Sequence, residues 1–180
     1  HEFVTESQVE LAYSDVELPI GHEERMMPPR VEGKILQALE LDENDHVLEI
    51  GTGSGYLTAL LAAQAKEVTT VELHGELQKT AQSRLNGFDN INYQVGDASQ
   101  QWDDDKQYDA IVLTGSVPAV LDSYLQQLKL GGRLFIIYGQ SPAMKSSIFT
   151  RVTTDEWNEE VLFETDIKPL SHSEKKTFTF

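Results

Sequence analysis

The stretch that decides the fold reads VLEIGTGSGY and runs from Val47 to Tyr56. A short apolar strand ends at Ile50, glycines follow at alternating positions, and an Ala/Leu-rich helix starts at Tyr56. A glycine-rich turn between a buried strand and a helix is typical of the first strand of a doubly wound α/β sheet, where ligands bind beyond the carboxyl ends of the strands. Glycines there permit turns closed to other residues and let the backbone approach a ligand closely.

On both sides of this stretch, strand-like and helix-like patterns alternate. The predicted strands cover residues 46–50, 67–72, 91–95, 108–113 and 133–138. One predicted helix starts at Pro29, and three more cover residues 56–65, 74–86 and 117–128. Gly131-Gly132 is predicted to end the last of these. Beyond them, strands at 147–154 and 161–167 around a polar turn at 155–158 predict a hairpin. The sequence therefore predicts an α/β fold with a doubly wound, mostly parallel, Rossmann-like sheet and a C-terminal antiparallel hairpin.

The composition excludes several classes of function. The 180 residues fit one domain, and the lack of cysteine excludes thiolate catalysis, disulfides and cysteine-rich zinc sites. A net charge of -16, from 30 acidic and 14 basic residues, repels nucleic acid. No apolar run reaches the roughly 20 residues of a membrane span, and no signal-peptide pattern opens the chain. We expect a cytoplasmic monomer that binds neither nucleic acid nor membrane.

Two carboxylates follow the next strands and suggest a ligand. Glu72 ends the second strand, 21 residues after Gly51, where a carboxylate accepts hydrogen bonds from ribose hydroxyls. Asp97 follows the third strand, in reach of an adenine amino group. Tyr56 stands where a dinucleotide fingerprint has its third glycine, so no pyrophosphate cradle is expected. Taken singly, Glu72 is also consistent with a solvated strand end and Asp97 with a turn former, but the set predicts S-adenosylmethionine.

The predicted cofactor-binding residues lie on this loop and at the ends of the following strands. They are Glu49, Gly51, Thr52, Gly53, Ser54, Gly55, Glu72, Leu73, Asp97, Ala98 and Thr114. No metal site is predicted, because the histidines have no partner at i+4 and the acidic run 103–105 reads as a solvated loop.

Several longer motifs carry a resemblance to a known family. They are VLEIGTGSGYLTA at 47–59, AYSDVELPIG at 12–21, YDAIVLTG at 108–115, LGGRL at 130–134 and IKPL at 167–170. The chain in these segments resembles the protein-L-isoaspartate O-methyltransferases. The resemblance implies transfer of a methyl group from S-adenosylmethionine, leaving S-adenosylhomocysteine, to the carboxylate of isoaspartyl residues in damaged proteins or peptides. It also implies that helices precede His1 in the full protein.

The resemblance breaks after Gly21, on the acceptor side. The family reads x-G-Q-T-I-S there, whereas this chain reads HEERMM, which puts Arg25 at the threonine position and Met27 at the serine position. We expect Arg25 either to hold a substrate carboxylate by a forked pair or to pair with Glu23 or Glu24. A carboxylate acceptor is ionised at neutral pH, so its methylation requires no general base.

Two hydroxyl residues remain as acceptor-side candidates. Thr114 matches a threonine of the family, Ser116 stands where alanine is usual, and both are also consistent with capping of a helix at Val117. The predicted catalytic residues are thus Thr114 and Arg25. We divide the single domain, 1–180, into an acceptor-side segment (1–28), a cofactor-binding core (29–140) and the hairpin region (141–180).

Three functions agree with these motifs. The first is isoaspartyl methyl transfer, the second is methyl transfer to a different acceptor, and the third is S-adenosylmethionine binding without catalysis. All three keep the cofactor site and differ only at residues 22–27.

Overall fold

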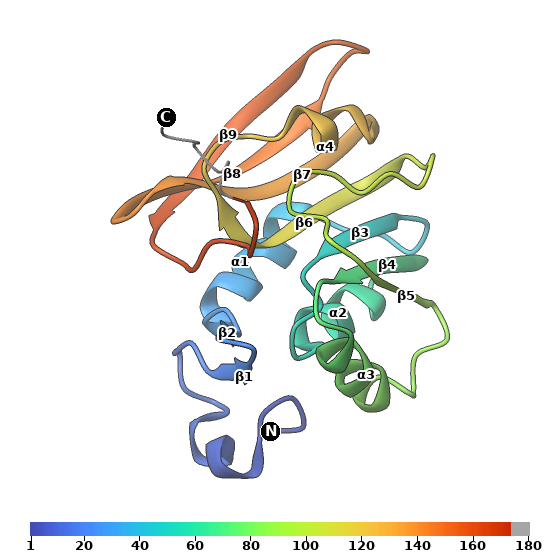
Figure 1. Cartoon of the computed structure of the whole chain (residues 1–180). Helices are drawn as coiled ribbons and strands as arrows, with labels where there is room; N and C mark the ends of the chain where they lie inside the picture. Colours follow the sequence, from blue (N-terminus) through green and yellow to red (C-terminus); the bar gives the residue numbers. More distant parts are fainter. Residues whose placement is uncertain (174–180) are drawn as a thin grey trace, which may run out of the picture.

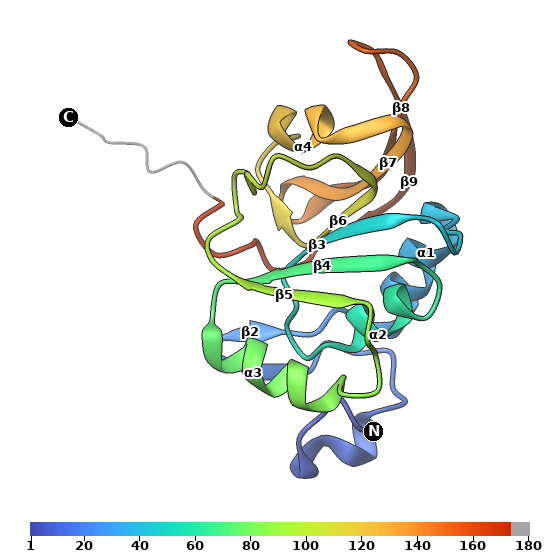
Figure 2. The ribbon, with the colours of Figure 1, turned by 90° about the vertical axis from the view of Figure 1, so that its right-hand side faces the viewer.

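The centre of the molecule is a twisted sheet in the strand order β5-β4-β3-β6-β7-β8-β9 (Figure 1, Figure 2). The structure is a computed structural model and describes residues 1–173. The strands are β3 (His46–Ile50), β4 (Glu67–Glu72), β5 (Ile91–Val95), β6 (Tyr108–Val117), β7 (Leu128–Gln140), β8 (Ala143–Arg151) and β9 (Trp157–Thr165). Strands β3 to β7 pair in parallel, and β8 and β9 extend the sheet in antiparallel register. The predicted fold class is confirmed.

Helices and the N-terminal segment surround this sheet. The helices are α1 (Pro29–Leu39), α2 (Tyr56–Ala62), α3 (Gly75–Arg84) and α4 (Asp122–Gln126). A 3-10 helix η1 (Glu6–Leu11) and the two short strands β1 (Pro19–Gly21) and β2 (Glu24–Arg25) precede them. The N-terminal residues lie at the end of the molecule opposite the β8–β9 hairpin (Figure 1).

Alternation along the central strands builds a core on each face of the sheet. Val47 belongs to one buried cluster together with Ile35 of α1 and Leu61 of α2. Its neighbour Leu48 belongs to a second cluster, together with Tyr124 of α4. Because successive side chains of a strand point to opposite faces, a strand covered on both sides is buried along its length, as β3 is from Val47 to Ile50.

The strand order reverses beside β3, and this reversal places the glycine loop. From β3 the chain proceeds outward through β4 to β5, then returns to form β6 on the other side of β3. The connections after β3 and β6 therefore run apart and leave a crevice at the carboxyl ends of these strands. The glycine loop, residues 51–55, therefore begins at this crevice.

The helix predicted at 117–128 is wrong in its first half. Strand β6 continues to Val117, and α4 covers only Asp122–Gln126. Pro118 explains part of the difference, because a residue before proline is held in an extended conformation. The chain after β9 explains the rest: the backbone of Ser116 pairs with Lys168 and Leu170 and so takes a strand partner that the local sequence does not reveal.

The sequence predicts that Gly131-Gly132 ends that helix, but both glycines lie inside β7. The pairing jumps there, since Tyr108 lies opposite Leu128 whereas Ala110 lies opposite Arg133. The extra residues of β7 form a bulge, in which Gly131 has a φ of +79°. At Gly132 a Cβ would lie 2.9 Å from the carbonyl oxygen of Lys129, so the bulge requires glycine.

The predicted hairpin is present, with its turn earlier than predicted. Strand β9 begins at Trp157, opposite Arg151, instead of at Val161. The Trp157 indole explains the earlier start, because it donates to the carbonyl oxygen of Leu125 (3.0 Å) and faces the Arg151 guanidinium at 5.5 Å. Among residues 1–173, no helix is long and apolar enough to cross a membrane.

Candidate functional site

The loop between β3 and α2 depends on its glycines. Gly51, Gly53 and Gly55 have φ values of +97°, +55° and +88°, all in the region that L side chains avoid. A Cβ on Gly51 would lie 2.2 Å from Oγ1 of Thr114. The single O–H of Thr114 is shared between the carbonyl oxygens of Ile50 (2.9 Å) and Gly51 (2.8 Å), which fastens the loop to the end of β6.

Glu72 holds the same loop from the other side. Its side chain is 5% exposed, and its oxygens accept the backbone N–H groups of Gly53 and His74, each at 2.9 Å. A carboxylate has about four lone-pair positions, so these two bonds leave acceptor capacity for a ligand. Glu72 therefore fixes the loop and presents an acceptor at the cavity wall.

Asp97 lies two residues after the end of β5, and its side chain is about half exposed. It accepts the N–H of Ser99 (3.0 Å) and pairs with Nδ1 of His172 (2.8 Å). Desolvation opposes ionisation, but the hydrogen bonds from Ser99 and His172 outweigh it and lower the pKa of Asp97 below its ordinary value. Asp97 is thus an ionised acceptor at neutral pH.

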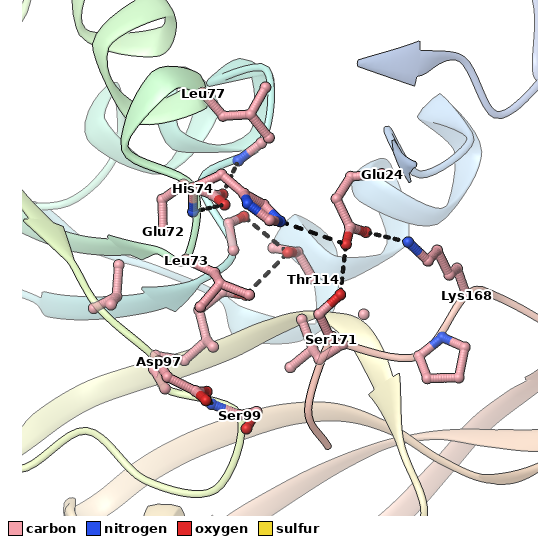
Figure 3. A pocket seen from close by; sticks show the side chains of 18 of the residues that line it. Glu24, Glu72, Leu73, His74, Leu77, Asp97, Ser99, Thr114, Lys168 and Ser171 are labelled. Atoms are coloured by element: carbon pink, nitrogen blue, oxygen red, sulfur yellow. Dashed lines mark hydrogen bonds and ion pairs between the residues drawn. The ribbon is translucent and has the colours of Figure 1, made fainter. Parts of the chain in front are cut away.

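These groups face a cavity of about 90 Å³ at the carboxyl ends of β3, β4 and β6 (Figure 3). The predicted cofactor residues that line it are Gly51, Gly53, Glu72, Leu73, Asp97, Ala98 and Thr114. Here the backbone is approachable, a buried carboxylate and an exposed carboxylate converge, and Leu77 and Val71 supply apolar contact. We call this the main cavity.

A smaller cavity of about 30 Å³ adjoins the main cavity on the side of β1, β2 and α1. It is lined by the predicted residues Thr52, Ser54 and Arg25, together with Met27 and Glu32. Gly51, Gly53 and Thr114 line both cavities, as do Ile20 of β1 and Arg25 of β2, so the glycine loop and the β1–β2 segment lie between them. We call this the second cavity.

Two predicted cofactor residues, Glu49 and Gly55, line neither cavity. Gly55 packs against α3, where a Cβ would lie 3.0 Å from Leu85. Glu49 is wholly buried behind the loop and accepts the hydroxyls of Thr58 and Thr70, each at 2.6 Å. Burial raises the pKa of Glu49 to about 8, although these two hydrogen bonds lower it. Strand alternation explains the position of Glu49, which points away from the crevice.

The acceptor-side expectations have different outcomes. Arg25 is exposed on β2 and forms no ion pair within residues 1–173, so the expected pairing with Glu23 or Glu24 is absent there. Met27 is 6% exposed and packs in the core. The capping interpretation of Thr114 and Ser116 is wrong, because both lie in β6; the Ser116 hydroxyl donates to the carbonyl oxygen of Ile167 (3.0 Å).

Sequence reasoning missed a polar cluster that ties the N-terminal segment to the chain after β9. The carboxylate of Glu24 contacts Nζ of Lys168 (2.9 Å) and the hydroxyl of Ser171 (2.7 Å), and lies 3.9 Å from Nε2 of His74. Figure 3 shows these three contacts meeting at Glu24. These residues lie far apart in sequence and carry no motif, so no local signal indicates them. Because Glu24, Lys168 and Ser171 line the main cavity, the cluster joins its walls.

Comparison with known proteins identifies similar chains. The family model for protein-L-isoaspartate(D-aspartate) O-methyltransferase matches residues 1–174. A protein-L-isoaspartate O-methyltransferase of Magnetococcus marinus is 38% identical over 172 residues, which is 94% of this chain and 75% of that relative.

Solved structures agree at the level of the fold. One, described as a protein-L-isoaspartate O-methyltransferase, superposes with a TM-score of 0.82 at 24% identity, over 96% of this chain and 58% of that chain. A Plasmodium falciparum structure, described as a beta-aspartate methyltransferase in complex with S-adenosyl-L-homocysteine, gives a TM-score of 0.79 at 17% identity, over 94% of this chain and 84% of that one.

Proposed function

The chain belongs to the protein-L-isoaspartate O-methyltransferase family, and from this premise we propose that it methylates isoaspartyl carboxylates in damaged proteins with S-adenosylmethionine as methyl donor. The observation that carries the assignment is Glu72, a buried carboxylate fixed at the cavity wall by the N–H groups of Gly53 and His74. A cytoplasmic location and a monomeric state stay predictions.

The residues of the main cavity fit the cofactor. Glu72 has acceptor positions left for ribose hydroxyls, and Asp97 offers an ionised acceptor for the adenine amino group. The glycine loop presents its backbone to the ligand, since Gly51 and Gly53 line the cavity without side chains. The volume of the cavity is smaller than that of pockets that usually hold such ligands. We therefore expect the Glu24–Lys168–Ser171 cluster to move outward when the cofactor enters.

Methylation of an ionised carboxylate requires little acid–base catalysis by the protein. When bound, S-adenosylmethionine would supply a methyl group on a sulfonium: the O–CH3 bond would form as the C–S bond breaks, and the electron pair of that bond would stay on the sulfide that leaves. Arg25 attracts and orients the acceptor carboxylate, and Thr114 holds the loop that separates donor and acceptor. Orientation and exclusion of water then carry the rate enhancement.

The test of this function is transfer of labelled methyl groups to an isoaspartyl peptide, beside its aspartyl twin, with the full-length protein. We expect base-labile label on the isoaspartyl peptide alone. The loss of the family's acceptor hydroxyl at Met27 gives the second candidate, a different acceptor. Binding of S-adenosylhomocysteine without transfer to either peptide would favour that candidate or a non-catalytic module.

The Glu72→Ala variant tests the cofactor site. Because it removes the ribose acceptor and one anchor of the loop, we expect its affinity for S-adenosylhomocysteine to fall roughly 10- to 50-fold. Calorimetric titration measures this. Glu76→Ala is the matched control, since Glu76 is exposed on α3 and lines neither cavity. Unchanged affinity in Glu72→Ala would remove Glu72 from the cofactor site.

The Arg25→Met variant tests the acceptor side. We expect the KM for the isoaspartyl peptide to rise about 10-fold, because the variant lacks the guanidinium that binds the acceptor carboxylate in the wild type. Arg25 also lines the main cavity, so affinity for S-adenosylhomocysteine is measured beside KM, and we expect it to change much less than KM. Added salt should narrow the difference in KM between variant and wild type. Arg30→Met is the control: Arg30 lies on α1, is bound to Asp15 at 3.0 Å, and lines neither cavity. An equal KM in the two variants would contradict the role of Arg25.

A further inference from the structure

Glu32 carries a buried carboxyl group that has no role in the proposed function. It lies in the first turn of α1 and is 4% exposed, yet it lines the second cavity. Its Oε2 is buried and has no hydrogen-bond partner among the residues that the structure describes. A buried polar atom without a partner is costly, and it indicates a partner that joins when a ligand binds.

The surroundings of Glu32 favour its neutral form. The groups that face it are Glu49 of β3, which it repels, Tyr56 of α2, and Arg25 of β2, which shares the cavity without pairing with Glu32. Burial, and next the charge of Glu49, raise the pKa of Glu32 to about 8. At neutral pH Glu32 is therefore a carboxylic acid whose O–H can donate a hydrogen bond.

The acceptor side of the site needs such a donor. Of the two positions where the family carries hydroxyls, Arg25 supplies charge and Met27 supplies only packing. Glu32 lines the same cavity as both of them, and Thr114 and the glycine loop separate that cavity from the main one.

We propose that Glu32 is a specificity-determining residue that donates a hydrogen bond to the acceptor's isoaspartyl carboxylate, in place of the missing hydroxyl at position 27. This inference rests on the proposed function. Arg25 meets the same carboxylate from the exposed side of the cavity. When Glu32 ionises, the donor is lost and two carboxylates face each other, so acceptor binding weakens as the pH rises.

The experiment measures KM and kcat for an N-acetylated, C-amidated isoaspartyl peptide between about pH 6.5 and pH 9, at saturating cofactor. Such a peptide has no other group that titrates in this range. The forms compared are the full-length wild type, Glu32→Gln, which keeps an N–H donor that does not titrate, and Glu32→Met, which keeps the volume without a donor. Methyl ester and released methanol are counted together.

We expect the wild-type KM to rise roughly 10-fold between pH 7 and pH 9, with a smaller change in kcat. Glu32→Gln should show a KM a few-fold above the wild type at pH 7 that changes much less with pH, since Glu49 behind the loop still titrates in this range. Glu32→Met should show a KM raised roughly 10-fold or more. Binding of S-adenosylhomocysteine and thermal unfolding, measured on each form, separate this effect from damage to the fold or the cofactor site. A dependence of KM on pH that largely flattens in Glu32→Gln is not expected from a merely structural role.

The outcomes separate the two proposals. No methyl transfer by the wild type at any pH overturns the proposed function and this inference with it. Transfer by the wild type with a flat KM, or equal KM values in Glu32→Gln and Glu32→Met, overturns the inference alone. A KM that falls as the pH rises would show that ionisation of Glu32 does not weaken acceptor binding, which also overturns it.

Discussion

Replacing Gly51 with alanine is expected to abolish measurable cofactor binding. The new Cβ would lie 2.2 Å from Oγ1 of Thr114, and the residue would have to keep a φ of +97°. The left-handed conformation alone costs an L residue roughly 1–2 kcal/mol. Because Thr114 holds the carbonyl oxygens of Ile50 and Gly51, neither side of the contact can yield without loosening the loop. We expect affinity for S-adenosylhomocysteine to fall more than about 100-fold, together with a loss of stability.

Two further variants make this prediction specific. Gly33→Ala places a methyl group in open space on helix α1, so we expect unchanged cofactor affinity and a small gain in stability, about 0.5–1 kcal/mol. The double variant Gly51→Ala/Thr114→Ala removes the clash and keeps the unfavourable φ, so it should recover part of the stability. Calorimetric titration and urea unfolding measure both quantities. Near-wild-type binding by Gly51→Ala alone would show that the loop opens elsewhere to admit the ligand.

The fold could be predicted largely from local patterns, because each central element carries its own signal. Strands β3, β4 and β5 begin and end where the apolar patterns do. The errors arise where partners come from far along the chain. Strand β6 extends past Leu113 because Ser116 pairs with Lys168 and Leu170, and Trp157 enters β9 because its indole reaches α4. The division of the domain at residues 28 and 140 stays a prediction.

The candidate site could be predicted only where a motif marks it. The glycine loop, Glu72 and Asp97 follow strands in order, and the crevice brings them together. Glu49 belongs to the same motif, yet the pleat of β3 turns it into the core. Glu24, Lys168 and Glu32 carry no signal, because their positions depend on how the N-terminal segment and the chain after β9 cross the sheet edge. Such contacts follow from tertiary packing and not from local sequence.

Glu49→Gln is expected to reverse the order of stability between variant and wild type as the pH rises. The pKa of Glu49 in the folded protein is about 8, against 4.5 for the free group, so between these values the folded state keeps a proton that the unfolded state has lost. Stability from this group is therefore full below about pH 4.5 and is lost as the pH rises to about 8, on the order of 1 kcal/mol per pH unit. Glutamine does not titrate, and its oxygen can still accept the hydroxyls of Thr58 and Thr70.

Urea unfolding between about pH 5.5 and pH 7.5 measures the difference, a range in which ordinary carboxylates are already ionised in both states. We expect the wild type to lose stability more steeply than Glu49→Gln, and the variant to be the more stable form at the upper end. Glu32 keeps part of the slope in both proteins, since burial raises its pKa in the same direction. Glu43→Gln is the control, because it replaces the same type of carboxyl group in an exposed turn. We expect its stability to change with pH as that of the wild type does. Parallel curves for Glu49→Gln and the wild type would mean that Glu49 stays ionised in the core, and a cation or water must then compensate its charge.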